Sequence, residues 1–237
     1  MEYLLIVVLG LVIGGLIGSL INVLATRLPA EVNIFGPPLA TATGEPDSRQ
    51  LVPFLGARTD SHGIDRPNLA TQLGAAALTT LALVFQGATW SAVETIVLTS
   101  ILLAILRIDW QHHLIYTITI WPGILLALLF SLFHSPGQLL SASIAGAAAA
   151  GVFLFLFFLA IAIYKRRALG FGDVLLAGLI GTMVGLELVT AAILLGMILA
   201  AVGGLFLILI RVKSRTDYIP YGAYLSLGAI ITVLLAA

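Results

Sequence analysis

Long apolar runs separated by short polar stretches make up most of the chain. A helix that crosses a lipid bilayer needs about 20 apolar residues, and eight runs reach or approach that length. We predict spans over residues 3–26, 69–85, 92–106, 118–133, 139–164, 174–186, 188–210 and 219–236. The pattern therefore predicts an all-α, polytopic membrane protein with about eight transmembrane helices, folded as a single integral membrane domain over residues 1–237.

The composition supports this class of protein. Of the 237 residues, 60% are hydrophobic and 9% are charged, and the mean hydropathy is +1.14, which is far outside the usual range for soluble globular domains. The chain has no cysteine, and this excludes disulfides and thiolate-bound zinc. Eleven basic and eleven acidic residues leave no net charge, so we expect membrane lipid, and no nucleic acid, as a partner. The sequence leaves the oligomeric state open.

The segment over residues 27–68 differs from the rest of the chain. It holds six of the nine prolines and four arginines, so we predict a long extramembrane loop between the first and second spans. The first run lacks the basic start of a cleavable signal peptide, and we expect it to remain as a span. Its Gly10, Gly14 and Gly18 recur every four residues and predict a close-packing helix face, while Asn22 is expected to donate a hydrogen bond between packed helices.

The basic residues predict the orientation in the membrane. All eleven Lys and Arg residues fall in four loops between the spans, over residues 27–68, 107–117, 165–173 and 211–218. Because basic loops face the cytoplasm, we predict that these four loops are cytoplasmic and that both termini lie outside. Two acids, Asp109 and Asp173, then emerge on the same, cytoplasmic side.

These two acids are the candidate catalytic residues. Carboxylates at a membrane are costly to hold and mark candidate functional sites. Two carboxyl groups close together in a partly dehydrated site cannot both ionise easily and can share one proton. That arrangement suits an aspartic protease, in which the ionised acid takes a proton from water and the protonated acid hydrogen-bonds the scissile carbonyl. Gly170 and Gly172, just before Asp173, would permit backbone angles closed to other residues and a close approach of a substrate strand.

Simpler roles for the polar residues stay open. Asp173 precedes an apolar run and could be a helix N-cap. Asp109 could be a boundary charge balanced by Arg107. His112 and His113 lie three and four positions after Asp109, on the face of a continuing helix. A metal site there is conceivable, but no further ligands cluster nearby in the sequence, and we expect no metal.

Four motifs give the chain a resemblance to a known family. They are Gly18-Ser19-Leu20-Ile21-Asn22-Val23 with Arg27-Leu28-Pro29, Ile108-Asp109 with His113-Leu114-Ile115, Gly170-Phe171-Gly172-Asp173-Val174-Leu175-Leu176 with Gly181, and Ile219-Pro220-Tyr221-Gly222-Ala223-Tyr224. In this order they resemble the type IV prepilin peptidases, membrane aspartic proteases with a Gly-x-Gly-Asp signature. The resemblance covers nearly the whole chain and implies that Asp109 and Asp173 are the catalytic pair. The supporting motif residues are Asn22, Arg27, Pro29, Gly170 and Gly172.

The resemblance implies a substrate and a location. The expected substrate is a type IV prepilin or pseudopilin with an apolar N-terminal helix. Its leader would be cleaved at the cytoplasmic face of the inner membrane of a prokaryote, in pilus assembly or protein secretion. No cofactor is expected for proteolysis. Many members also methylate the new N-terminus, so S-adenosylmethionine is expected only if that second activity is present.

Two departures from the family pattern stand out. Many bacterial members bind zinc through paired Cys-x-x-Cys motifs in the first cytoplasmic loop, whereas this chain has no cysteine. The family usually has Pro-Asp where this chain has Tyr116-Thr117, so the turn after Asp109 is expected to differ in detail.

Two other classes of function stay open. A non-enzymatic transporter could use Asp109 and Asp173 as a proton or cation site, but a transporter should carry its acids near mid-membrane and often shows internal repeats. An inactive relative kept for assembly would retain the same motifs. The placement of both acids at span ends favours the peptidase.

Overall fold

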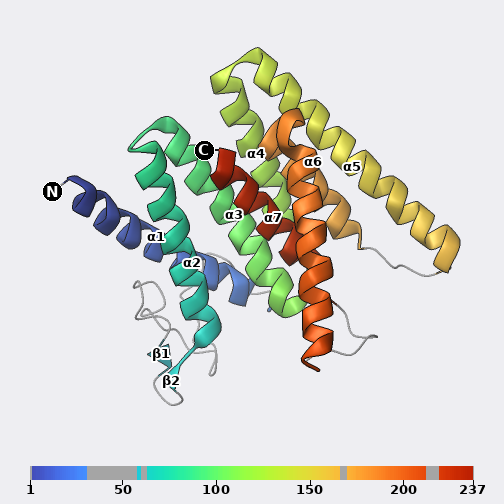
Figure 1. Cartoon of the computed structure of the whole chain (residues 1–237), viewed down its shortest axis with the longest axis horizontal. Coiled ribbons are helices and arrows are strands. Elements are labelled where there is room, and N and C mark those ends of the chain that lie inside the picture. Colours follow the sequence, from blue (N-terminus) through green and yellow to red (C-terminus); the bar gives the residue numbers. More distant parts are fainter. Residues whose placement is uncertain (1, 31–57, 60–62, 166–169, 212–218, 237) are drawn as a thin grey trace. The chain divides into compact units, whose positions relative to one another are not determined.

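The computed structural model describes residues 2–30, 58–59, 63–165, 170–211 and 219–236 (Figure 1). Its elements are α1 (Glu2–Arg27), β1 (Arg58–Thr59), β2 (Gly63–Ile64), α2 (Arg66–Gln86), α3 (Trp90–His112), α4 (Thr117–His134), α5 (Pro136–Tyr164), α6 (Phe171–Leu209) and α7 (Tyr221–Ala236). The predicted all-α class is confirmed. Within the described residues, the two strands form one short antiparallel hairpin, in which Arg58 pairs with Ile64.

The chain forms two compact units, Met1–Arg107 and Ile108–Ala236. The first unit contains α1, the hairpin, α2 and most of α3, and the second contains the end of α3 and helices α4 to α7. Asp109 and Asp173 both belong to the second unit, so their arrangement is set by one body of packed helices.

In the first unit, α1 packs on α2 through its glycines. A Cβ atom at Gly14 would lie 2.5 Å from the Cα of Ala76, and a Cβ atom at Gly18 would lie 2.5 Å from the Cα of Gln72. Gly10 faces Thr80 in the same way. Side chains at these positions would push the two backbones apart. The predicted packing face of the first span is therefore confirmed.

In the second unit, small residues let α5 and α7 each approach α6 closely (Figure 1). A Cβ atom at Gly181 of α6 would lie 2.5 Å from the carbonyl oxygen of Ala145 on α5. On the other contact, Gly196 of α6 packs directly on the backbone of Gly228 in α7. These close approaches hold α6 between its two neighbours, and α6 carries Asp173 at its start.

The long helix α6 breaks at Gly185, where φ is 72° and ψ is −179°. A positive φ favours glycine because it has no Cβ atom. The break frees the backbone N–H of Leu186, which donates to Oγ of Ser141 on α5 at 2.9 Å. The predicted spans over residues 174–186 and 188–210 correspond to the two halves of this one element.

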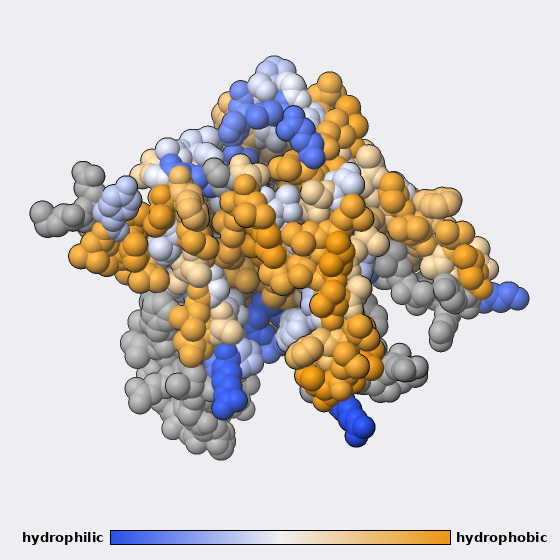
Figure 2. Space-filling model, viewed as in Figure 1, coloured by the Kyte–Doolittle hydropathy of each residue, from blue (hydrophilic) through white to orange (hydrophobic). Residues whose placement is uncertain are grey.

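Six of the described helices, α1 to α6, are long and apolar enough to cross a membrane, and α7 is a shorter apolar helix. Figure 2 shows hydrophobic residues gathered along the outer faces of α5 and α6. The exposed ones include Val152, Phe155, Phe158 and Ile163 on α5, and Ile198, Val202 and Phe206 on α6. Such surfaces suit contact with lipid chains. The count of eight spans and the outside location of both termini stay predictions.

Several predicted boundaries were wrong, and α5 and α6 begin at Pro136 and Phe171 and not at residues 139 and 174. The third helix does not end at residue 106 but continues to His112, so Asp109 lies in its last turn and not in a loop. Helix α2 begins at Arg66 and not at residue 69, because Asp65 caps it and Pro67 is compatible with the first turn. Of the predicted 27–68 loop, residues 31–57 and 60–62 lie outside the described part of the chain.

Candidate active site

Asp109 is held by the start of another helix. Its side chain is buried, and its Oδ2 accepts a hydrogen bond of 2.7 Å from the backbone N–H of Ala223. The N–H of Gly222 also interacts with this carboxyl group. Both amides belong to the first turn of α7, where N–H groups have no partner within the helix. An acidic side chain at such a terminus is stabilised by the exposed amides and the helix dipole.

Asp173 is the third residue of α6 and is also buried. Its Oδ2 accepts from the backbone N–H of Gly170 at 3.2 Å, and its own N–H donates to the carbonyl oxygen of Gly170 at 3.2 Å. Gly170 is the N-cap of α6, and the Asp173 side chain reaches back to its N–H in the manner of the N3 acid of a capping box, while the other bond of the pair is between backbone groups. The alternative that Asp173 is the helix N-cap was therefore wrong, because Gly170 holds that position and Asp173 lies in the first turn.

Neither signature glycine has an unusual backbone angle, and Gly172 is the one with little space around it. Gly170 has an extended conformation, with φ −77° and ψ 144°, and Gly172 is not among the described residues with positive φ. The expectation that they adopt angles closed to other residues was therefore wrong. A Cβ atom at Gly172 would lie 2.9 Å from the Cβ of Ile115. The close neighbour of Gly172 in this structure is thus a side chain of the protein itself.

The two acids lie near enough for their charges to interact. The hydroxyl group of Tyr221 lies within the same electrostatic range of Asp173, and His113 lies within that of Asp109. We name Asp109 and Asp173 the acid pair. One segment therefore lies near both acids, since Tyr221 is within electrostatic range of Asp173 while the next two amides interact with Asp109.

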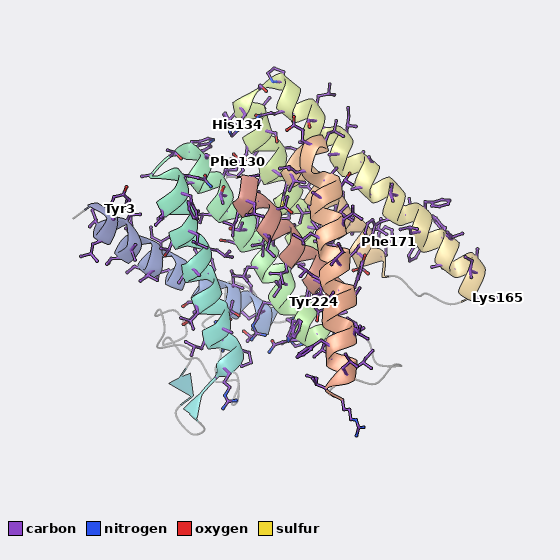
Figure 3. The ribbon with its side chains drawn as sticks, viewed as in Figure 1. Tyr3, Phe130, His134, Lys165, Phe171 and Tyr224 are labelled. Carbon is purple, nitrogen blue, oxygen red and sulfur yellow. The ribbon has the colours of Figure 1, made fainter. Side chains whose placement is uncertain are left out.

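Several residues of this site were not singled out for a role from the sequence. Ile115 and the segment Pro220–Ala223 lie within the motifs quoted above, so a signal for them existed, but the sequence did not indicate what they contact. Tyr224, labelled in Figure 3, packs its ring edge-on against Trp110 at 5.8 Å between centroids. This contact holds the start of α7 to the end of α3, beside Asp109.

The supporting residues from the first motif lie in the first unit, and Asn22 belongs to a buried polar cluster there. Asn22 donates from Nδ2 to the carbonyl oxygen of Asn68 at 2.9 Å, which confirms its predicted helix-packing hydrogen bond. Arg107 donates to Oδ1 of Asn68 at 3.1 Å, and Nδ2 of Asn68 donates to Asp65 at 2.9 Å. The side chain of Arg27 is buried.

Three further positions considered from the sequence lie at or just after helix ends. Pro29 lies in the turn after α1 and is half-buried. His112 ends α3, and His113 follows it with a φ of 54°. Within the described ranges, no group of three or more His, Cys, Asp or Glu side chains could hold a metal ion.

Comparison with known protein families tests the motifs that contain Asp109 and Asp173. Residues 96–205 match the model of the type IV leader peptidase family. That stretch resembles a leader peptidase. It contains Asp109, Ile115, Gly170, Gly172 and Asp173, so the two motifs that carry the acid pair fall inside the match. The resemblance inferred from the motifs is confirmed.

Three relatives are similar over a longer stretch, and each is named "Prepilin leader peptidase/N-methyltransferase". The chain is 28% identical to that of Pseudomonas aeruginosa over 62% of this chain and 51% of the relative. It is 29% identical to that of Pseudomonas putida over 69% of this chain and 57% of the relative. It is 29% identical to that of Aeromonas salmonicida over 61% of this chain and 50% of the relative. The chain thus spans about half the length of the curated relatives it matches. No solved structure matches it significantly.

Proposed function

We propose that this chain is a membrane aspartic endopeptidase that removes the leader peptide of type IV prepilins or pseudopilins. The observation that carries the proposal is the acid pair, two buried carboxyl groups whose charges interact although they lie on different helices. The names of the relatives supply the substrate class.

The acid pair suits hydrolysis of a peptide bond. With one proton shared between the two carboxyl groups, the ionised one accepts a proton from a water molecule as that water attacks the scissile carbonyl carbon. The protonated one donates a hydrogen bond to the carbonyl oxygen and stabilises the charge that develops there. Collapse of the tetrahedral intermediate returns a proton to the leaving amine. The cycle needs no group beyond the two acids and water.

The surroundings of the acid pair suit an apolar substrate helix. Large apolar side chains stand exposed beside each acid: Trp110 next to Asp109, Phe171 two residues before Asp173, and Leu114 on the segment between α3 and α4. Figure 3 labels Phe171 at the start of α6. A prepilin that presents its leader junction just ahead of an apolar helix could rest that helix against these side chains.

The site is proposed to face the cytoplasm at the inner membrane. Asp109 lies at the end of α3 and Asp173 at the start of α6. The predicted cytoplasmic loops 107–117 and 165–173 contain Asp109 and Asp173. Basic residues mark the cytoplasmic side, and Lys165 follows the end of α5 in the second of these predicted segments.

Cleavage by the purified full-length chain tests the function. The substrate is a prepilin-like peptide with a short basic leader ahead of an apolar helix, in detergent or lipid. We expect one cut before the apolar segment, and no cut by Asp109→Asn or Asp173→Asn. Variants that cut as well as the wild type would refute the catalytic assignment. Lack of any cut by the wild type would favour the transporter or the inactive relative.

A second activity is suggested only by the relatives' names, which include N-methyltransferase. We assign no residue of this chain to S-adenosylmethionine. The mass of the cleaved product, with and without S-adenosylmethionine, decides whether a methyl group is added.

A further inference from the structure

One side chain lies against the backbone that carries Asp173 and against the backbone that donates to Asp109. Ile115 contacts Gly172, which directly precedes Asp173, and it also contacts Gly222 of α7. A Cβ atom at Gly172 would lie 2.9 Å from the Cβ of Ile115, and a Cβ atom at Gly222 would lie 2.7 Å from its Cδ1. Gly222 in turn packs on Asp109, since the same added Cβ would lie 3.1 Å from Oδ2 of that acid.

The chain is built to bring Ile115 to this place. Helix α3 ends where the N–H of His113 donates to the carbonyl oxygen of Asp109 at 2.9 Å, and His113 then adopts a left-handed conformation with φ 54°. The chain leaves the helix there, and residues 113–116 have no regular structure before α4. This turn lets a residue only six positions after Asp109 lie against the start of α6, which carries Asp173.

The kind of side chain matters as well. Isoleucine branches at Cβ, so its χ1 angle is restricted and its shape is stiff. An added Cβ atom at Gly172 would lie 2.9 Å from Cβ and 3.4 Å from Cδ1 of Ile115, whereas at Gly222 the nearest atom of Ile115 is Cδ1, at 2.7 Å. The tightest contact at Gly172 is therefore with Cβ, and that at Gly222 is with Cδ1. A stiff side chain packed directly between two glycine backbones fixes the distance between them, because the contacts on both sides are close.

We infer that Ile115 is a positioning residue that sets the separation of Asp109 and Asp173 by lying between Gly222 and Gly172. The inference rests on the proposed function. Its physical basis is that proton sharing and water attack depend steeply on distance, so that a displacement of 1 Å can cost about 10²-fold in rate.

The two contacts allow a selective rescue experiment. Gly222→Ala places a methyl group against Cδ1 of Ile115, and Gly172→Ala places one against its Cβ. Ile115→Val removes Cδ1 but keeps Cβ. We therefore expect each glycine variant to lose about 10²-fold in kcat, and Ile115→Val to restore about 10-fold of that loss for Gly222→Ala and nothing for Gly172→Ala. Restoration of both glycine variants, or of neither, overturns the inference.

A second readout separates positioning from general support of the fold. Ile115→Val alone should shift the limbs of the pH–rate profile, because the separation of two carboxyl groups governs how they share a proton. The matched control is Ile144→Val on the exposed face of α5, which should leave the profile unchanged. A lowered Tm with an unmoved profile would show that Ile115 only supports the fold.

The same assay distinguishes failure of the inference from failure of the function. If the wild type cuts and the Asp109→Asn variant is inert, the proposed peptidase stands, and the rescue pattern then judges Ile115 alone. If the wild type does not cut the prepilin-like peptide, the proposed function fails and the inference fails with it.

Discussion

The backbone N–H of Ala223 donates to Oδ2 of Asp109 at 2.7 Å, across 114 positions of sequence. This bond ties the last turn of α3 to the first turn of α7. Asp109 thus has a structural partner as well as a proposed catalytic role. Substitutions of Asp109 can separate its effect on stability from its effect on cleavage.

Asparagine and alanine at position 109 should differ in stability and agree in activity. Asp109→Asn keeps an oxygen that can accept from the Ala223 N–H, whereas Asp109→Ala leaves that buried amide without its partner. We expect the alanine variant to lose about 1–3 kcal/mol of unfolding free energy relative to the asparagine variant. Unfolding in detergent measures this. Both should be inert in cleavage, and an active asparagine variant would contradict the proposed chemistry.

The pH dependence of cleavage should have two limbs. At low pH both acids are protonated and no base remains to accept a proton from water. At high pH both are ionised and none can donate to the carbonyl oxygen. The rate should therefore peak between two apparent values that belong to the pair. A kcat/KM profile of the wild type measures this, and a profile with a single limb would argue against a shared proton.

The hydroxyl group of Tyr221 should contribute to turnover. It lies within electrostatic range of Asp173, where a phenol can donate a hydrogen bond to the acid or to the substrate carbonyl. We expect Tyr221→Phe to lower kcat by about 10-fold, a typical effect of losing one hydrogen bond. Tyr224→Phe is the matched control, because it keeps the ring that packs on Trp110. Equal effects of the two variants would assign Tyr221 a packing role only.

The glycine face of α1 should tolerate no side chain. Gly14→Leu would place a side chain where the Cα of Ala76 lies 2.5 Å from an added Cβ atom. We expect a loss of about 3 kcal/mol or more, at the upper end of costs for overpacking. Leu16→Ala, at an exposed position of the same helix, is the control and should change stability little. Similar unfolding of the two variants would contradict the close approach of α1 and α2.

Asn68 should be the most sensitive member of the polar cluster in the first unit. Its side chain accepts from Arg107 and donates to Asp65, and its carbonyl oxygen accepts from Asn22. Asn68→Ala removes two hydrogen bonds to charged groups and should cost about 3 kcal/mol. Asn22→Ala removes one neutral bond and should cost about 1 kcal/mol. The reverse order, measured by unfolding in detergent, would show that Asn68 does not link the helices.

Many features of the fold and of the candidate site could be predicted from the sequence, because each depends on a short stretch of neighbouring residues. The apolar runs predict helices, since a chain in lipid must satisfy its own backbone hydrogen bonds. The four-residue spacing of Gly10, Gly14 and Gly18 predicts a packing face, because residues four apart lie on the same side of a helix. Asp109 and Asp173 were recognisable because a carboxylate in such a chain is costly, and the expected location of both acids on one side followed from the basic loops alone.

What only the tertiary structure decided concerns contacts between distant segments. No local pattern indicates that the start of α7 donates to Asp109, that Ile115 lies against two glycine backbones, or that Gly172 is needed for space and not for its backbone angles. Helix ends were misplaced where capping by Asp65 or the turn at His113 outweighed hydropathy. Such features depend on how whole helices pack, and packing distances are set by side chains that are remote in sequence.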